Sequence, residues 1–214
     1  MIRSILLSLV LVASGLPLNA HPHIFVDANG SFIFNDKQEL VAVRIYWLYD
    51  EYSTLFIYES QNLDEDGDGE LSAADLEKVK LGETIWQAGY EGDTYLWIGG
   101  EQQKLSRPTH ASAEEVAGRI GVSFELRLET PQIMAGQTAR LKLYDPSYYY
   151  AYSIPGEGLL YGNAPACQTW VDRPDQTAQM AELQAELNAL SQEETPEDMN
   201  IGARFAEDVV LQCD

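Results

Sequence analysis

Basic residues and histidines are scarce in this chain of 214 residues. It contains 13 Lys and Arg against 34 Asp and Glu, which gives a formal net charge of −21. Nucleic acid is excluded as a partner because phosphate contacts require clustered Lys and Arg, and the same deficit argues against docking onto anionic lipid. Only three histidines are present, so any histidine chemistry must use His21, His23 or His110. No Ser/His/Asp hydrolytic triad stands out from so small a set.

The chain also lacks an apolar run long enough to cross a bilayer, which requires about 20 residues. The longest run, residues 5–16, has twelve residues and follows a short positively charged start. A small residue at Ala20 completes the pattern of a secretory signal peptide over residues 1–20. Cleavage after Gly15 is the alternative. We therefore expect an exported chain with one periplasmic domain over residues 21–214 and no direct membrane insertion.

Cysteine is almost absent, since only Cys167 and Cys213 occur. A metal site built from them would need a CxxC pair or a nearby histidine, and the sequence offers neither. Two cysteines in an exported chain predict one disulfide. The Cys167–Cys213 bridge would connect the C-terminal segment to the core and stabilise the fold by about 2–4 kcal/mol.

What the chain does have is a β-rich pattern of alternating and β-branched residues, with 45% apolar residues to form a core. Two hairpins are predicted, one from residues 24–34 and 40–49, the other from 95–98 and 102–105. Further strands occur at a spacing typical of sandwiches, over residues 122–128, 139–144, 148–154 and 169–171. The tyrosines at 148–152 indicate sheet and core rather than a ligand cage. The fold class predicted is α+β and β-rich, with an antiparallel β-sandwich-like core.

Two segments break the strand pattern. Residues 53–90 have the pattern of a helix, an acidic loop and a second helix, so we expect a helix-loop-helix insertion in the domain. Residues 175–190 follow Pro174 and place apolar residues on a single helical face, which predicts a C-terminal helix. These apolar residues are Met180, Leu183, Leu187 and Leu190.

The acidic loop of the insertion, residues 64–75, matches the twelve-residue calcium loop of EF-hand proteins. Carboxylates occupy its first, third and fifth positions, Gly69 occupies the sharp turn, and the seventh residue offers a backbone carbonyl. The ligand positions are Asp64, Asp66, Asp68, Glu70 and Asp75. Asp75 replaces the usual bidentate Glu at the last position, so calcium affinity should fall or Mg²⁺ should compete. We expect a structural calcium ion here, and a solvated acidic turn is the alternative.

A His-Pro-His segment would begin the mature chain if cleavage falls after Ala20. The free α-amine and the His21 imidazole can then chelate one ion, with His23 or His110 completing the site. Imidazole suits Zn²⁺, Ni²⁺, Co²⁺ and Cu²⁺. Pro22 excludes a square-planar site that uses the second amide nitrogen, because proline has no N–H. Alternatively, the two histidines merely flank the cleavage site.

Several segments together resemble one known family. They are residues 21–28 (HPHIFVDA), the strand before Tyr46 and Trp47, the acidic loop, residues 144–149 (YDPSYY), residues 202–206 (GARFA) and Cys213. Over essentially the whole mature chain, the sequence resembles the domain of unknown function family numbered one thousand and seven. Its members are described as the periplasmic component of an uncharacterised transport system, often beside a nickel/cobalt-type permease, with zinc uptake implicated. The resemblance implies a role in divalent-metal transport, with His21 and His23 at matching motif positions and His110 outside them.

The sequence thus predicts a non-enzymatic module that binds zinc or another divalent transition metal and assists an integral-membrane nickel/cobalt/zinc-type permease. Two alternatives stay open. An amino-terminal histidine brace would bind copper and oxidise a polymer, using the amine, His21 and either His23 or His110. A calcium-clipped periplasmic scaffold would bind no transition metal.

Overall fold

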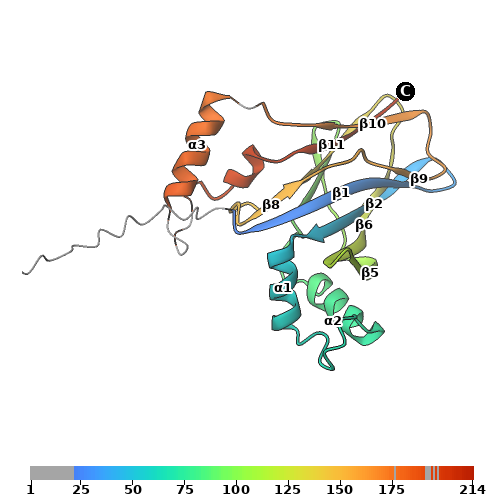
Figure 1. Ribbon diagram of the computed structural model, residues 1–214. Coiled ribbons are helices and arrows are strands. Elements are labelled where there is room, and N and C mark those ends of the chain that lie inside the picture. Colours follow the sequence, from blue (N-terminus) through green and yellow to red (C-terminus); the bar gives the residue numbers. More distant parts are fainter. Residues whose placement is uncertain (1–21, 176, 191–193, 195, 197) are drawn as a thin grey trace, which may run out of the picture.

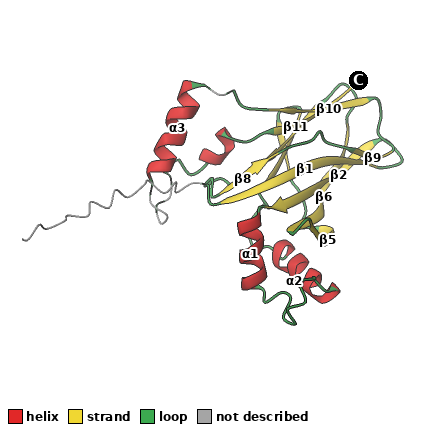
Figure 2. Ribbon diagram, in the orientation of Figure 1, coloured by secondary structure: helices red, strands yellow, loops and turns green. Residues whose placement is uncertain are grey.

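The computed structural model describes residues 22–175, 177–190, 194, 196 and 198–214. They form two β-sheets that pack against each other. The three helices lie near the end of the sheets at which β1 begins, with α1 and α2 on one side of that end and α3 on the opposite side (Figure 1). Figure 2 shows how strongly strands outnumber helices in this architecture. The predicted signal peptide, its cleavage site and His21 lie outside the described residues.

The first sheet contains the predicted N-terminal hairpin, β1 (Ile24–Phe34) and β2 (Glu39–Tyr49). Its strand order is β5-β6-β2-β1-β8, and β9 also pairs with β1. The additional strands are β5 (Thr109–Val116), β6 (Arg119–Ile133), β8 (Tyr150–Ser153) and β9 (Leu160–Gly162). β8 and β9 both run parallel to β1, whereas β2, β5 and β6 pair antiparallel.

The second sheet has the order β10-β11-β7-β3-β4 and is antiparallel throughout. Its strands are β3 (Thr94–Ile98), β4 (Glu101–Gln103), β7 (Thr138–Leu143), β10 (Cys167–Asp172) and β11 (Asp208–Cys213). The register places Cys167 directly opposite Cys213, and the predicted disulfide joins them. This pairing connects the last strand to the sheet, and a disulfide is typical of an exported protein.

The core lies between the two sheets. Phe32, Ile45 and Phe124 of the first sheet and Leu141 and Val209 of the second are fully buried in one cluster. The sheets approach closely at Gly30, where a Cβ atom would lie 2.5 Å from Leu141 Cδ2. The β-rich α+β class with two packed sheets is therefore confirmed, and the two parallel pairings to β1 are its unpredicted feature.

The helical insertion begins slightly earlier than predicted, with α1 (Glu51–Ser60) followed by α2 (Ala73–Thr84). Asp50 caps α1 by accepting from the Ser53 N–H and hydroxyl at 2.9 and 2.7 Å, and it also accepts from the Phe25 N–H at 2.9 Å. The cap therefore connects α1 to the start of β1. In the C-terminal region, α3 (Ala178–Ala189) buries Leu183 and Leu187 against the short 3-10 helix η1 (Ile201–Arg204).

Three strands lack a sequence prediction, and each has a physical reason. β5 is an edge strand whose side chains are mostly polar and exposed, so no apolar alternation marks it. β9 has only three residues, and β11 is nearly buried throughout, which removes alternation. Within the part of the chain that the structure describes, no helix has the length and apolar character needed to cross a membrane.

Candidate functional site

His23 lies just before β1, where the chain meets the segment leading into β8. The backbone N–H groups of His23 and Ile24 both donate to the Tyr149 carbonyl, at 2.9 and 3.2 Å. The imidazole of His23 stacks on the Tyr149 ring, with centroids 4.6 Å apart. His23 is therefore positioned through both its backbone and its side chain.

The position of Tyr149 is itself set by a chain turn that Asp145 stabilises. The Asp145 carboxylate accepts hydrogen bonds from the backbone N–H groups of Ser147, Tyr149 and Tyr150 and from the Ser147 hydroxyl, at distances of 2.7 to 3.2 Å. An aspartate that bonds the backbone ahead of it stabilises such a turn. The YDPSYY segment thereby acquires a fixed conformation beside His23.

The C-terminal GARFA segment packs on the same turn. Gly202 donates to the Pro146 carbonyl at 3.0 Å, and a Cβ atom at Gly202 would lie only 1.8 Å from the Asp145 carbonyl oxygen. Tyr148 stacks on Phe205 with centroids 4.3 Å apart. Three segments that are far apart in the sequence, and that carry the family resemblance, therefore meet next to His23.

A cavity of about 350 Å³ opens beside His23, and Tyr49, Tyr52, Glu83 and Tyr150 also line it. Glu83, near the end of α2, accepts a hydrogen bond from the Tyr49 hydroxyl at 2.5 Å. Burial raises the pKa of Glu83, and the hydrogen bond from Tyr49 opposes that rise. The cavity thus combines an imidazole and a carboxylate, both of which are ligand types that Zn²⁺ accepts.

An adjoining cavity of about 600 Å³ shares Glu83 with the first and contains Asp93, which is only 4% exposed. One Asp93 oxygen accepts hydrogen bonds from the Tyr90 and Tyr152 hydroxyls at 3.0 and 2.8 Å. Burial raises the pKa of Asp93 to about 7, the charge of Asp145 adds to the rise, and the two tyrosine hydrogen bonds oppose it. This carboxyl group therefore changes charge near neutral pH.

His110 lies elsewhere. Its Nδ1 atom is 3.2 Å from an Oε atom of Glu125, and its side chain is 67% exposed. The strand register through β6 and β2 places Thr109, the residue before His110, level with Ser31, which is eight residues and three strands from His23. At about 3.3 Å per residue and 4.8 Å per strand, this corresponds to roughly 30 Å. His110 and His23 therefore lie far apart in one copy of the chain. The prediction that either His23 or His110 completes a site with His21 stays a prediction, because His21 lies outside the described residues.

The acidic loop brings three of its predicted ligands together. Asp64, Asp66 and Asp68 each offer a carboxylate oxygen within 4.8 Å of the others, and they form the only such group of three in the described residues. Asp64 also organises the turn, since its two oxygens accept from the N–H groups of Asp68 and Gly69 at 3.0 and 3.2 Å. The arrangement provides a concentration of negative charge on one turn.

The two remaining predicted calcium ligands are placed differently. The Glu70 side chain is exposed. Asp75 is the partner of Ser72 in a capping box, accepting from the Ser72 N–H and hydroxyl at 3.1 and 2.6 Å, and its other oxygen lies 3.2 Å from Lys78 Nζ. Asp75 therefore stabilises the first turn of α2 and is not part of the group of three carboxylates.

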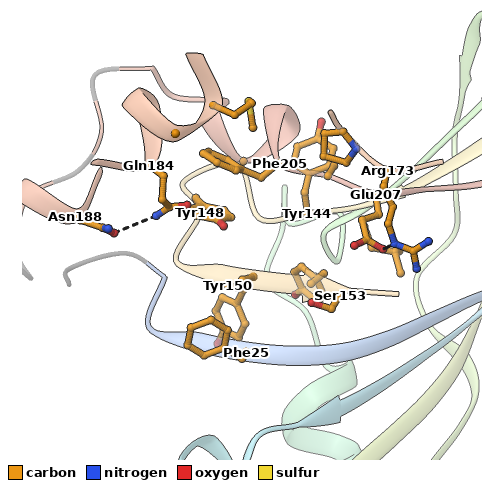
Figure 3. A pocket seen from close by; sticks show the side chains of 18 of the residues that line it. Phe25, Tyr144, Tyr148, Tyr150, Ser153, Arg173, Gln184, Asn188, Phe205 and Glu207 are labelled. Carbon is orange, nitrogen blue, oxygen red and sulfur yellow. Dashed lines mark hydrogen bonds and ion pairs between the residues drawn. The ribbon is translucent and has the colours of Figure 1, made fainter. Parts of the chain in front are cut away.

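A third cavity, of about 740 Å³, lies between α3 and the start of β8. Figure 3 shows its aromatic side chains, including Phe25, Tyr148 and Phe205, with Arg173 beside Glu207. The Arg173 Nε atom is 3.4 Å from Glu207 Oε2. Among the predicted metal-binding residues that the structure describes, none lines this cavity.

Sequence reasoning did not identify Glu83 or Asp93. Glu83 follows an ordinary polar helix pattern, and Asp93 stands in a Glu-Gly-Asp turn that resembles any exposed loop. Glu83 receives its hydrogen bond from Tyr49 of β2, and Asp93 receives one from Tyr152 of β8, so the surroundings of both carboxylates come from distant parts of the sequence. The local sequence around Glu83 or Asp93 therefore gives no indication that either residue lines a cavity.

The fold and site define a disulfide-bonded, two-sheet α+β domain with a helical insertion and a histidine–carboxylate cavity where its signature segments meet. Residues 5–213 match the model of a family described as "Protein of unknown function (DUF1007)", so the chain belongs to that family. It is similar to a Haemophilus influenzae protein named only "Uncharacterized protein", at 24% identity over 198 residues, covering 91% of this chain and 92% of the relative. No solved structure matches the chain.

Proposed function

We propose that this chain is a periplasmic binding protein for a divalent transition metal, with zinc as its ion, and that it assists an integral-membrane nickel/cobalt/zinc-type permease. The observation that carries the proposal is the placement of His23. Its imidazole is held against Tyr149 in a cavity that also contains the Glu83 carboxylate. The family resemblance, read from the sequence, supplies the transport context.

The rest of the metal site would come from the chain terminus. His21 precedes His23 by two residues and begins the mature chain if cleavage follows Ala20. The α-amine, the two imidazoles and the Glu83 carboxylate then form a set of nitrogen and oxygen ligands suited to zinc. The separation of roughly 30 Å between His110 and His23 leaves His110 out of this set.

The residues of the proposed metal site fit a role in metal binding better than a role in catalysis. Two serine hydroxyls that line the two cavities, those of Ser53 and Ser147, donate to the carboxylates of a helix cap and of a turn, which gives them a structural role. The Glu83 and Asp93 carboxylates hydrogen-bond to tyrosines. The acidic surface of the chain attracts cations without selecting among them.

The second ion of the proposal is a structural calcium in the acidic loop. Asp64, Asp66 and Asp68 supply the oxygen ligands, together with the Glu70 carbonyl. Asp75 could bind calcium directly only by losing the hydrogen bonds that it accepts from Ser72. We therefore expect weak calcium affinity.

A chelator-competition titration with zinc tests the proposal on mature protein whose N-terminus is confirmed by intact mass, in the presence of calcium. We expect one tightly bound zinc ion. His23→Ala should weaken binding at least tenfold, whereas His110→Ala, the matched histidine control, should change it less than twofold. A variant with one glycine inserted before His21 keeps both imidazoles and displaces the amine, so it should also bind more weakly.

Zinc binding that is absent, or indifferent to His23, would contradict the metal-delivery role. Copper-dependent oxidation of ascorbate by the same protein would instead support the histidine brace. Unchanged growth of a strain carrying His23→Ala in zinc-poor medium would favour the calcium-clipped scaffold.

A further inference from the structure

The cavity that contains Asp93 has an unusual lining of aromatic rings and carboxylates. Trp86, Tyr90 and Tyr150 line it, together with Tyr152 and the buried Trp47. The rings are in contact with one another, with centroid distances of 5.5 Å for Trp86 and Tyr90 and 6.2 Å for Tyr150 and Tyr152. Aromatic faces attract cations through their negative π-electron density.

The same cavity holds three carboxylates, Glu83, Asp93 and Asp145. Among the described residues, no Lys, Arg or His forms an ion pair with any of them. Within the described residues, these carboxylates accept hydrogen bonds from tyrosine hydroxyls, from Ser147 and from backbone N–H groups. Burial without a cationic partner raises the pKa of Glu83 and Asp93, and a cation bound beside them would supply the missing counter-charge and favour their ionised form.

The nearest cation of the chain does not fill this role. The Arg107 guanidinium lies 5.9 Å from the Trp86 ring centroid, and its nitrogens donate to the carbonyls of Tyr90 and Gln87 at 2.9 and 2.5 Å. Arg107 lines a neighbouring cavity with Trp86 and does not line the one that contains Asp93. It therefore leaves the three carboxylates without a counter-charge. Its position also shows that the Trp86 ring tolerates a cation nearby.

The spacing of the carboxylates argues against a bare metal ion in this cavity. Among the described residues, only the acidic loop brings three metal-ligand atoms within 4.8 Å of one another. Glu83, Asp93 and Asp145 thus share a cavity but not a common coordination sphere. A larger cation, whose charge is spread over an organic group, fits a cavity of about 600 Å³ better.

A buried donor indicates a second property of the ligand. The indole N–H of Trp47 has no hydrogen-bond partner among the described residues, and Trp47 is only 3% exposed. A buried N–H without a partner is costly, and because Trp47 lines this cavity, a ligand oxygen that displaces the atoms covering the indole nitrogen would satisfy it.

We propose that this cavity binds a small organic cation that also carries an oxygen acceptor, such as an amino alcohol or a quaternary ammonium alcohol. The positive group lies among Trp86, Tyr90 and Tyr150 and next to Asp93, and the oxygen accepts from Trp47. This site shares Glu83 with the proposed zinc ligands, whereas His23 does not line it.

Choline is the probe, and 3,3-dimethylbutan-1-ol, which has the same shape without the charge, is its control. Binding to the full mature chain is measured by tryptophan fluorescence, because Trp47 and Trp86 line the cavity, and by calorimetry. Choline should give saturable binding at concentrations up to about 10 mM, and the neutral analogue should bind at least tenfold more weakly, because it lacks the cation–π and carboxylate attraction. Tetramethylammonium, which lacks the oxygen, should bind with intermediate affinity.

The variant Asp93→Asn keeps the shape of the side chain and removes its charge, so it should weaken choline binding at least fivefold. Glu101→Gln, which removes an exposed acid on β4 that does not line the cavity, should leave it unchanged. Trp86→Leu provides a second variant if Asp93→Asn alters the circular dichroism spectrum, and it should also reduce choline binding at least fivefold. His23→Ala should bind choline normally even where it fails to bind zinc.

Equal affinity for choline and its neutral analogue would overturn the proposal, as would the absence of saturable choline binding. Choline binding that survives both Asp93→Asn and Trp86→Leu would place the cation elsewhere and overturn it equally.

Discussion

The imidazole of His23 stacks on the phenol ring of Tyr149 with an angle of 28° between their planes, while the carbonyl of the same tyrosine accepts the His23 N–H at 2.9 Å. One residue thus sets both the direction in which the chain enters β1 and the plane of the imidazole. Tyr149 in turn depends on the Asp145 turn, at 2.7 Å from its N–H to Oδ2. The histidine is therefore held by the folded core rather than by the terminus alone.

Replacement of Tyr149 tests this relationship. Tyr149→Ala should weaken zinc binding about three- to tenfold, because a stacked aromatic pair contributes about 0.5–1.5 kcal/mol. Tyr149→Phe should bind zinc like the unaltered chain. Competition titration measures both, and Tyr95→Ala, which removes a ring stacked on Tyr144 in the other sheet, is the control. Equal weakening by the Phe and Ala substitutions would assign the effect to the hydroxyl group instead.

Asp93 should make folding stability depend on pH. Its pKa rises from 3.8 to about 7 in the folded chain, so the folded state binds a proton that the unfolded state has released. The contribution is complete below about pH 4 and is lost as the pH rises through 7, with an upper limit of about 4 kcal/mol. Tyr90, Tyr152 and Asp145 are the groups that face this carboxyl group.

Urea unfolding at pH 5 and pH 8 measures the effect. The unaltered chain should be more stable at pH 5, and Asp93→Asn should reduce the difference between the two pH values. Identical pH dependence in the two proteins would show that Asp93 is not the group responsible. Glu83 contributes in the same direction, because burial also raises its pKa, so the variant should retain part of the slope.

Gly202→Ala should destabilise the fold by about 2 kcal/mol or more, because its Cβ would lie 1.8 Å from the Asp145 carbonyl oxygen. For a domain of this size, the melting temperature should fall by about 4–8 °C. Gly156→Ala is the matched control, since the nearest atom to its Cβ is Asn29 Nδ2 at 3.8 Å. If both alanines melt alike, the close approach of the GARFA segment to the turn is incorrect.

Loss of the Cys167–Cys213 bridge should cost about 2–4 kcal/mol. Because the bridge joins the adjacent strands β10 and β11, the strand pairing should survive and the melting temperature should fall by about 5–15 °C. Calorimetry with and without reductant measures this change. The double variant Cys167→Ala and Cys213→Ala should melt at the reduced temperature and no longer respond to reductant.

Calcium should stabilise the acidic loop. At calcium concentrations about 100 times the dissociation constant, binding adds about 2.7 kcal/mol to the free energy of unfolding, which thermal melting detects. Asp66→Asn should abolish the increase. Asp66 is a better choice than Asp64, because Asp64 also stabilises the turn through its hydrogen bonds to backbone N–H groups. Glu101→Gln, an exposed acid on β4, is the control. A calcium response that persists in Asp66→Asn would contradict the proposed ligands.

The hairpins and helices could be predicted because their signals are local. The alternation in β2, the Gly99-Gly100 turn between β3 and β4, and the Ser72–Asp75 capping box all lie within short windows of sequence. The disulfide followed from the presence of only two cysteines. β5 could not be predicted, because an exposed edge strand needs no apolar face.

The candidate site was predictable only in part. His23 was identified from the His-Pro-His motif, but its neighbours Tyr149 and Glu83 come from segments 126 and 60 residues away in the sequence. His110 was included because histidines are few, and the strand register separates it from His23. Residue type can suggest a ligand, whereas only the packed sheets determine which ligands meet.

The most direct measurement is anomalous diffraction at the zinc absorption edge from crystals of the mature protein grown with one equivalent of zinc. The account predicts one strong peak within coordination distance of the His23 imidazole, with His21 as a further ligand and His110 without a peak. A peak confined to the Asp64–Asp68 carboxylates, or none at His23, would contradict it.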